Sequence, residues 1–498
     1  MIKFKDDCLS GELLNSFRDQ EHEDCILEKI LPEIKEMEIS ADNNNFQQQF
    51  LRLVLKLKKS FEDGNPSNVL SDIVSVNQLI SVAIPNYFEN EEFINKLVKS
   101  KIILNLLEIA FELDVIGEQM ELFYKNSFNA LTTLHYLSTF SKELSNKIGA
   151  SYFWVKFRKN IHNFDPNSIL IGLSIGINIL IDGSMNDMLQ YNKQGVTQLL
   201  VDIASINKFS EKTAMKIIES TQVMACYGLY IFNYRAKVFY PEYYEGYFRS
   251  IALLILDVPE LGKIHLLHSI NIILKNISVN PSFLFELNDE FEFIENLLEY
   301  SESNNDKLRS AALYTICYAL KSDFVGNETK EEIIIRLPWT KFNDLFASDP
   351  NISECIDAVY YSTLLGEDYV LCLNEYQTYQ KLVENFDNFK YQDRNKIISI
   401  ILIIIQNGSQ SLLEIFLKLK IIDLFSDMLG NENTFDNDII SALERFTFLL
   451  NSSHHTELIQ QFEDSEIVES LLEYIPNDLV VSILKRLEYF EILENLKL

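Results

Sequence analysis

Apolar residues recur along this chain at steps of three and four, the spacing that lines one face of an α-helix. The segment 307–321 shows this pattern clearly, and Asp306 before it can cap a helix. Two shorter helical patterns precede it, over 281–287 and 291–300. The apolar positions of the longest helix are Leu308, Ala312, Ile316 and either Ala319 or Leu320. The sequence therefore predicts a unit of three helices, of which the third is the longest.

The second helix of this unit has counterparts elsewhere in the chain. Residues 293–300, FIENLLEY, recur as 467–474, IVESLLEY, and other segments share the same apolar pattern. The fifth position serves as a marker of each copy. The marker residues are Leu106, Leu199, Leu297, Leu345, Val383, Phe425 and Leu471. Their spacing corresponds to whole numbers of a repeat of about 45 residues.

A three-helix unit with this period resembles the armadillo and HEAT repeats. The third helix of an armadillo repeat usually carries alanine at its crowded centre, and Ala130, Ala312 and Ala442 occupy that place. The resemblance covers roughly residues 60–490. It implies an all-α, right-handed α-solenoid over residues 50–498, preceded by an acidic segment or irregular cap over residues 1–49.

Composition supports this fold class. Glycine and proline account for 15 and 10 of 498 residues, below the usual levels of about 7% and 5%. Enzymes built on α/β folds, sandwiches and barrels need these residues at many turns, so the composition disfavours them. The apolar runs 168–181 and 397–405 are shorter than the roughly 20 residues of a membrane span, and we expect buried helices there.

Charge limits the classes of partner. The chain has 43 Lys and Arg against 73 Asp and Glu, a formal net charge of −30. Nucleic acids and anionic membranes are disfavoured unless a local basic patch overrides this mean, and protein partners with basic or extended segments are favoured. The compact basic clusters are 56–59 and 154–159, and each could touch a phosphate or an acidic peptide or form a solvated helix face.

The chain start and the cysteines indicate the compartment. The first residues are charged and form no apolar signal segment, so we expect a protein of the cytoplasm or nucleus that is not secreted. The six cysteines show no metal-site spacing, and no metal or cofactor is expected.

Two strings could carry chemistry. Gly172-Leu-Ser174-Ile-Gly176 matches the G-x-S-x-G nucleophile elbow, which requires a strand, a strained turn and a helix on a glycine-rich scaffold. The alternative is a buried helix whose small residues allow close packing. His265 and His268 share a helical face, but no further ligand lies one turn away. We therefore expect no enzyme, with a hydrolase based on Ser174 as the remote alternative.

The resemblance also suggests where a partner binds, because third helices line the concave face of armadillo proteins. The groove candidates are Thr132, Tyr136, Tyr314, Tyr318, Glu444 and Phe448. The segment 234–248 is the densest aromatic run and interrupts the repeats. It is either a recognition loop or a cover over a helix end. Its candidates are Tyr240, Tyr243, Tyr244 and Tyr247.

These observations predict a non-enzymatic scaffold or adaptor that binds a basic or extended protein segment in an acidic concave groove. An importin-like cargo adaptor is one alternative. Trp339 and Asn343 form the W-x-x-x-N string of that family, but they follow Pro338 on a second helix, and the third helices lack the Trp/Asn ladder. A regulatory subunit of an enzyme complex is the other alternative, and the sequence does not separate it from a scaffold.

Overall fold

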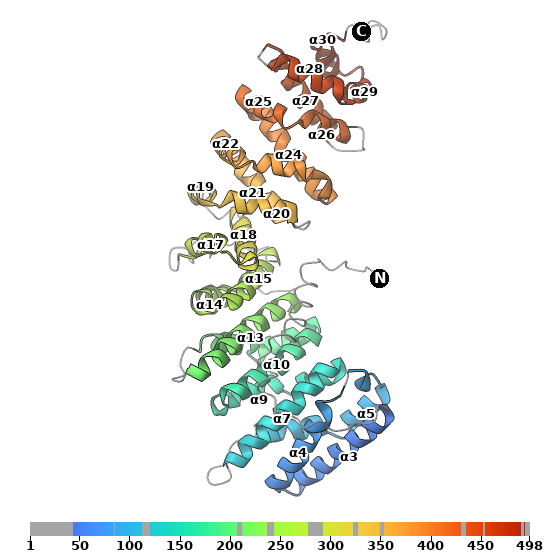
Figure 1. Ribbon diagram of the computed structural model, residues 1–498, viewed down its shortest axis with the longest axis vertical. Helices are drawn as coiled ribbons and strands as arrows, with labels where there is room; N and C mark the ends of the chain where they lie inside the picture. The colour runs from blue at the N-terminus through green and yellow to red at the C-terminus, as the bar shows by residue number, and fades with distance from the viewer. Residues whose placement is uncertain are drawn as a thin grey trace. The chain divides into compact units, whose positions relative to one another are not determined.

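Helices form every element in the described part of the chain. The computed structural model describes residues 43–83, 85–111, 120–206, 212–236, 244–276, 292–321, 327–348, 353–429, 435–451, 454–489 and 493. The chain divides into unit 1, Met1–Phe283, and unit 2, Leu284–Leu498. Helices are stacked within each unit (Figure 1).

Unit 1 contains helices of three kinds, named by their order within a repeat. The first helices are α5 (Glu91–Lys99), α8 (Lys142–Ala150) and α11 (Met185–Lys193). The second helices are α3 (Asn43–Glu62), α6 (Ile102–Phe111), α9 (Phe153–Asn160), α12 (Val196–Ala204) and α14 (Tyr244–Asp257). The third helices are α4 (Pro66–Ile80), α7 (Met120–Phe140), α10 (Pro166–Asp182), α13 (Lys212–Ala236) and α15 (Glu260–Asn276). Short 3₁₀ helices are η1 (Pro85–Phe88) and η2 (Ile161–Asn163).

Unit 2 has the same three kinds of helix. The first helices are α19 (Asn327–Arg336), α22 (Glu367–Glu375), α25 (Gln410–Lys418) and α28 (His455–Asp464). The second helices are α17 (Phe293–Ser301), α20 (Trp339–Ser348), α23 (Thr378–Glu384), α26 (Ile421–Met428) and α29 (Ile467–Leu472). The third helices are α18 (Asp306–Lys321), α21 (Ser353–Leu364), α24 (Tyr391–Asn407), α27 (Asp436–Phe446) and α30 (Asp478–Arg486). The 3₁₀ helices are η4 (Phe386–Asn388) and η5 (Thr447–Asn451).

Third helices pack on third helices in each unit. In unit 2, α18 contacts α21, α21 contacts α24, α24 contacts α27, and α27 contacts α30 (Figure 1). Ala130, Ala312 and Ala442 are each fully buried on third helices, where a larger side chain would push neighbouring helices apart. The all-α solenoid that the sequence predicts is confirmed. Its handedness and a uniform period of about 45 residues stay predictions.

One residue in a left-handed backbone conformation joins the first and second helices of several repeats. These residues are Lys101, Tyr152, Gly195, Gln377 and Lys420, and Glu292 has the same conformation directly before the second helix α17. A left-handed residue reverses the chain direction within a single step, so the second helix can begin at the next residue. Only Gly195 adopts this conformation without a steric cost, because it lacks a Cβ. The junctions provide an equivalent reference point in each of these repeats.

Two helix starts differ from the expectation. The helix α18 is capped by Asn305, whose side-chain oxygen accepts hydrogen bonds from the backbone of Lys307 and Leu308 at 3.0 and 3.3 Å. The expected cap, Asp306, lies within the helix instead. The helix α3 begins at Asn43, so the end of the segment expected over 1–49 is already helical. The short helix expected over 281–287 lies outside the described residues.

The two apolar runs are helices packed within the repeats. Most residues of α10 are buried, and α24 buries most of its isoleucines. Among the described residues, no helix combines the length and hydropathy that a membrane span requires. The expectation of buried helices is confirmed for both runs.

Candidate functional site

The groove candidates of unit 2 lie on or beside third helices. Tyr314 and Tyr318 are half-buried on α18, one turn apart. Glu444 is half-buried on α27. Phe448 was expected on the same helix but lies in η5, which follows it, and is 55% exposed. We refer to Tyr314, Tyr318, Glu444 and Phe448 as the unit 2 third-helix surface.

Cations pair with the carboxylates of these helices. Asp357 of α21 is mostly buried between Lys321 of α18 and Lys396 of α24, at 2.8 and 2.5 Å. Glu444 pairs with Arg486 of α30 at 2.9 Å. The same guanidinium lies 5.2 Å from the ring centre of Phe448. These pairs join adjacent repeats, and in each of them a carboxylate is neutralised by a cationic side chain.

Sequence reasoning missed the three-residue bridge at Asp357. Lys321 lies 36 residues before Asp357, and Lys396 lies 39 residues after it. The end of α18 meets the first half of α21, which in turn meets the first half of α24. The sequence signal that could have revealed the bridge is an acidic residue with a lysine at about this distance on either side of it. The repeat marker alone did not reveal it, since equivalent positions and contacting positions differ by several residues.

The groove candidates of unit 1 differ in accessibility. Thr132 of α7 is fully buried, and its hydroxyl donates to the carbonyl of Phe128 at 2.9 Å. Tyr136 is half-buried and stacks on Phe140, with ring centres 6.0 Å apart. A partner could contact Tyr136 without rearrangement, whereas Thr132 belongs to the packing between helices.

Polar contacts also join the third helices of unit 1. Thr133 of α7 donates to the side-chain oxygen of Asn77 of α4 at 2.6 Å. Asn178 of α10 donates to Ser138 of α7 at 3.0 Å. The hydroxyl of Ser174 and the Nδ1 atom of His135 are also 3.0 Å apart. Each contact holds neighbouring repeats in register.

The contact of Ser174 with His135 does not form a nucleophile elbow. Ser174 lies inside α10, with no strand and no turn before it, and is 6% exposed. The glycines beside it face aromatic rings: a Cβ on Gly172 would overlap Phe157, and one on Gly176 would overlap Trp154. The close-packing interpretation of this string is confirmed, and the elbow geometry is absent.

The pH dependence of stability provides a test of this contact. Burial lowers the pKa of His135 from 6.5 to about 4. Between these values the unfolded chain binds a proton that the folded protein does not, so stability is expected to fall as pH drops from 6.5 to 4. His135→Gln should flatten this part of the profile in denaturant titrations. The exposed residue His162 provides the control, His162→Gln, and an equal effect of both substitutions would contradict the assignment.

The aromatic segment 234–248 is partly helical. Its first residue, Tyr234, lies within α13 (Lys212–Ala236), and Tyr244 is the first residue of α14. Tyr240 and Tyr243 lie outside the described residues. The hydroxyl of Tyr247 accepts a hydrogen bond from Asn233 at 3.0 Å, and burial raises its pKa. Tyr247 is therefore a packing residue of α14, and recognition by the other tyrosines stays a prediction.

The histidine and cysteine candidates show packing roles. His265 of α15 is fully buried, with its ring centre 5.1 Å from that of Tyr227. His268 packs against Tyr230 at 5.9 Å. In the described part of the chain no three His, Cys, Asp or Glu residues gather to hold a metal ion. Of the cysteines described, Cys226, Cys317 and Cys355 are buried thiols and Cys372 is half-buried.

Trp339 and Asn343 are also internal. Both lie on the second helix α20, where Trp339 is fully buried and Asn343 is 6% exposed. The amide of Asn343 donates to the carbonyl of Tyr376 at 2.7 Å. The W-x-x-x-N string therefore holds repeats together and presents no peptide-binding ladder.

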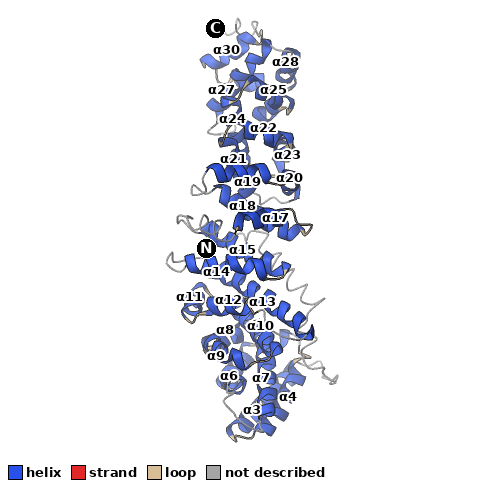
Figure 2. Cartoon of the chain, turned by 90° about the vertical axis from the view of Figure 1, so that its left-hand side faces the viewer, coloured by secondary structure: helices blue, strands red, loops and turns tan. Residues whose placement is uncertain are grey.

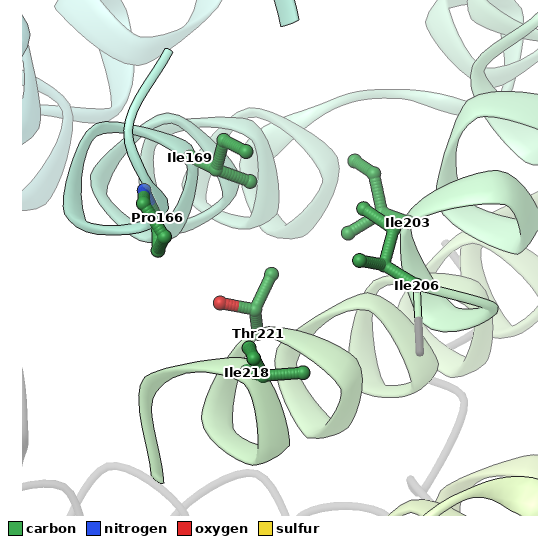
Figure 3. Close-up of a pocket in the computed structure, with 6 residues that line it drawn as sticks. All are labelled: Pro166, Ile169, Ile203, Ile206, Ile218 and Thr221. Atoms are coloured by element: carbon green, nitrogen blue, oxygen red, sulfur yellow. The ribbon is translucent and has the colours of Figure 1, made fainter. Parts of the chain in front are cut away.

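Unit 1 contains an apolar hollow beside α10, α12 and α13 (Figure 3). The lining residues are Pro166, Ile169, Ile203, Ile206, Ile218 and Thr221. The hydroxyl of Thr221 donates to the carbonyl of Ile217 at 2.6 Å, so it is already used within its helix. The hollow therefore lacks the convergent polar groups by which a small-molecule site fixes its ligand.

Comparisons with known proteins support the fold. No protein-family model and no curated protein matches the chain. The crystal structure of an engineered protein aligns with a TM-score of 0.57 at 12% identity, covering 88% of this chain and 99% of its own. A designed armadillo repeat protein aligns with a TM-score of 0.37 at 15% identity, covering 53% and 96%. With the three-helix stacking, the first likeness supports an all-α repeat fold over most of the chain.

Proposed function

We propose that this protein is a non-enzymatic scaffold that binds an extended segment of a partner protein along its third helices. The observation that carries the proposal is the unit 2 third-helix surface, where half-buried tyrosines lie on α18 and an exposed phenylalanine lies in η5, directly after α27. Aromatic side chains supply contact area with few rotatable bonds to order, which makes them frequent anchors in protein interfaces.

The charge of the chain favours a basic partner mainly by attracting it at long range, and less by forming ion pairs at the surface. Asp357 and Glu444 are already paired with cations. The net charge of −30 acts at longer range and raises the rate at which a Lys- or Arg-rich segment meets the surface. Because salt screens this attraction, the proposal includes an association rate that falls as ionic strength rises.

The double variant Tyr314→Ala with Tyr318→Ala tests the proposal. Loss of two aromatic anchors is expected to weaken partner binding about tenfold or more. A partner is first isolated from native lysate on the purified full chain at low salt, and its affinity for parent and variant is then measured by titration.

Tyr376→Ala is the control, because Tyr376 is an exposed tyrosine that follows α22, a first helix, and so lies away from the third helices. It is expected to leave the affinity unchanged. Equal binding by parent and double variant, or equal losses in variant and control, would count against the third-helix surface. Circular dichroism must show that all variants keep the helical content of the parent.

No specific observation favours the other functions. Trp339 and Asn343, the residues that suggested a nuclear cargo adaptor, are packed inside unit 2. Ser174 lies within a helix that lacks an elbow. A regulatory subunit would use the same third-helix surface, and the identity of the isolated partner would distinguish it from a general scaffold.

A further inference from the structure

Two buried thiols face each other across adjacent repeats of unit 2. The Sγ atoms of Cys317 in α18 and Cys355 in α21 are 3.9 Å apart. The two residues are 1% and 0% exposed. Helix α18 contacts α21, and Figure 2 shows one following the other in the stack. The packing of neighbouring repeats therefore brings two oxidisable sulfur atoms into contact, although they are 38 residues apart in the sequence.

The surrounding residues hold this contact in place. Lys321, one helical turn after Cys317, pairs with Asp357 of α21 at 2.8 Å. The thiol contact and the ion pair both join the last third of α18 to the first half of α21. Ala319 of α18 and Ala358 of α21 are buried on the same two helices. The ion pair fixes the stagger of the helices, and small side chains allow the close approach that a disulfide requires.

A thiol pair at this distance can do chemistry that a lone buried cysteine cannot. A structural zinc site takes four ligands, and within the ranges that the structure describes no third His, Cys, Asp or Glu gathers with the pair. Two thiols can instead form a bond with each other. Because a disulfide bond is about 2 Å long, the sulfur atoms must approach by about 2 Å, which rotation of the two side chains can supply.

The burial of the pair selects a small oxidant. A close-packed interior excludes glutathione disulfide and other bulky reagents. Hydrogen peroxide is close to water in size, and it can enter when neighbouring repeats part briefly. The first oxidation is slow, because peroxide reaches a sulfur atom only during such openings. The second is fast, since the other thiol is already beside the oxidised one.

We propose that Cys317 and Cys355 are a redox-sensitive pair that hydrogen peroxide converts into a disulfide between α18 and α21. The sulfur of one thiol attacks a peroxide oxygen, the O–O bond breaks, and a sulfenic acid and one water form. The sulfur of the second thiol attacks the sulfenic sulfur. An S–S bond forms, the S–O bond breaks, and the hydroxyl group leaves with the thiol proton as a second water. Two thiols are oxidised, and one peroxide is reduced to two waters.

The disulfide ties two repeats of unit 2 together. It links the third helices covalently, so the repeats can no longer part at this point. An excess of a small thiol reverses the bond by thiol–disulfide exchange. Helix α18 also carries Tyr314 and Tyr318, so oxidation holds this part of the unit 2 third-helix surface in one arrangement. The proposal does not rest on the binding function assigned to that surface.

Peptide mapping of the full chain tests the proposal. The reduced protein is treated with hydrogen peroxide, unfolded with N-ethylmaleimide to block the remaining thiols, and digested with trypsin and Glu-C without reductant. Glu367 lies between Cys355 and Cys372, so these cysteines end on different peptides. The linked peptide of Cys317 and Cys355 is expected at a yield at least fivefold above that of any other cysteine pair. Glutathione disulfide should give at least fivefold less of it than peroxide.

The parent chain oxidised in urea is the control for proximity. Once the chain is unfolded, the six cysteines are no longer held in place, and the preference for this pair should disappear. This comparison needs no variant, so it does not depend on how a substitution affects folding.

Hydrogen exchange measures the tie between the repeats. In the oxidised protein the amides of α18 and α21 are expected to exchange at least threefold more slowly than in the reduced protein. Dithiothreitol should restore the original rates. Helix α4 of unit 1 is the internal control and should exchange alike in both states.

The variant Cys355→Ala removes one partner. It is expected to abolish the linked peptide and the slower exchange, and to let Cys317 proceed to sulfinic acid, because no second thiol intercepts its sulfenic acid. Cys372→Ala is the matched control, since Cys372 is a half-buried cysteine of α22 outside the pair. It should leave the yield of the linked peptide unchanged. Circular dichroism verifies that both variants fold.

Four results would overturn the proposal. The first is a pair that stays unlinked after Cys372 has been fully oxidised. The second is a linked peptide that is equally abundant in urea, or that joins two copies of the chain when ¹⁴N- and ¹⁵N-labelled proteins are mixed. The third is unchanged or faster exchange in the oxidised protein, which would show that the bond does not hold the repeats together. The fourth is an equal yield from glutathione disulfide, which would exclude selection of a small oxidant.

Discussion

Replacing Trp339 by alanine is expected to lower the unfolding free energy of unit 2 by about 3–5 kcal/mol. The indole is fully buried at the start of α20, and its N–H donates to the carbonyl of Ile334 at 2.8 Å. Its ring packs edge-on against Phe342, with centres 4.8 Å apart. The substitution removes this contact area, leaves a cavity and strands a buried carbonyl.

Urea unfolding of the full chain, with hydrogen exchange as a local readout, measures this effect. Exchange should accelerate in α20 and in α23, which packs against it, because repeats transmit stability to their neighbours. Helix α4 of unit 1 is the internal control and should keep its protection. Trp339→Phe keeps an aromatic ring and is expected to cost less than half as much. A parent-like unfolding curve for Trp339→Ala would show that the indole contributes little.

Alanine in place of Gly176 is expected to destabilise unit 1 by about 1–3 kcal/mol. In an exposed helix the same change would stabilise by up to about 1 kcal/mol, so the sign of the effect is diagnostic. Here the added methyl group would overlap Trp154, with its carbon 2.8 Å from Cζ2. Gly172→Ala meets Phe157, 2.7 Å from Cζ, and should behave alike.

Gly228→Ala in α13 is the matched control for these two variants. A Cβ there would lie 3.1 Å from a methyl group of Leu200, at the flexible end of that side chain. The change in stability is expected to stay within about 1 kcal/mol. Thermal unfolding of the variants compares them directly. A gain of stability in Gly176→Ala would disprove the close approach of Trp154 to α10.

The helices and their stacking into repeats could be predicted from the sequence, because both depend on local patterns of apolar and small residues. The apolar spacing over 307–321 predicted α18 to within a residue. Scarcity of glycine and proline excluded the turn-rich folds. The small residues of α10 were interpreted as packing positions, and the structure places aromatic rings on both glycines.

The candidate site was harder to derive, because it depends on contacts between repeats. Thr132 and Tyr136 belong to the same predicted helix, yet only Tyr136 reaches solvent. Phe448 falls outside its helix, since α27 ends at Phe446. Tyr247 was grouped with loop tyrosines but lies in α14, hydrogen bonded to Asn233.

The sequence by itself determined the fold class, the three-helix unit and the positions buried at its centre. These properties follow from periodicity and residue size, which act within a few helical turns. Only the tertiary structure decided which residues face each other across repeats, including the two lysines that hold Asp357. Those pairings depend on the stagger and rotation of stacked helices. Small differences in loop length and in the junctions set both, and no local pattern encodes them.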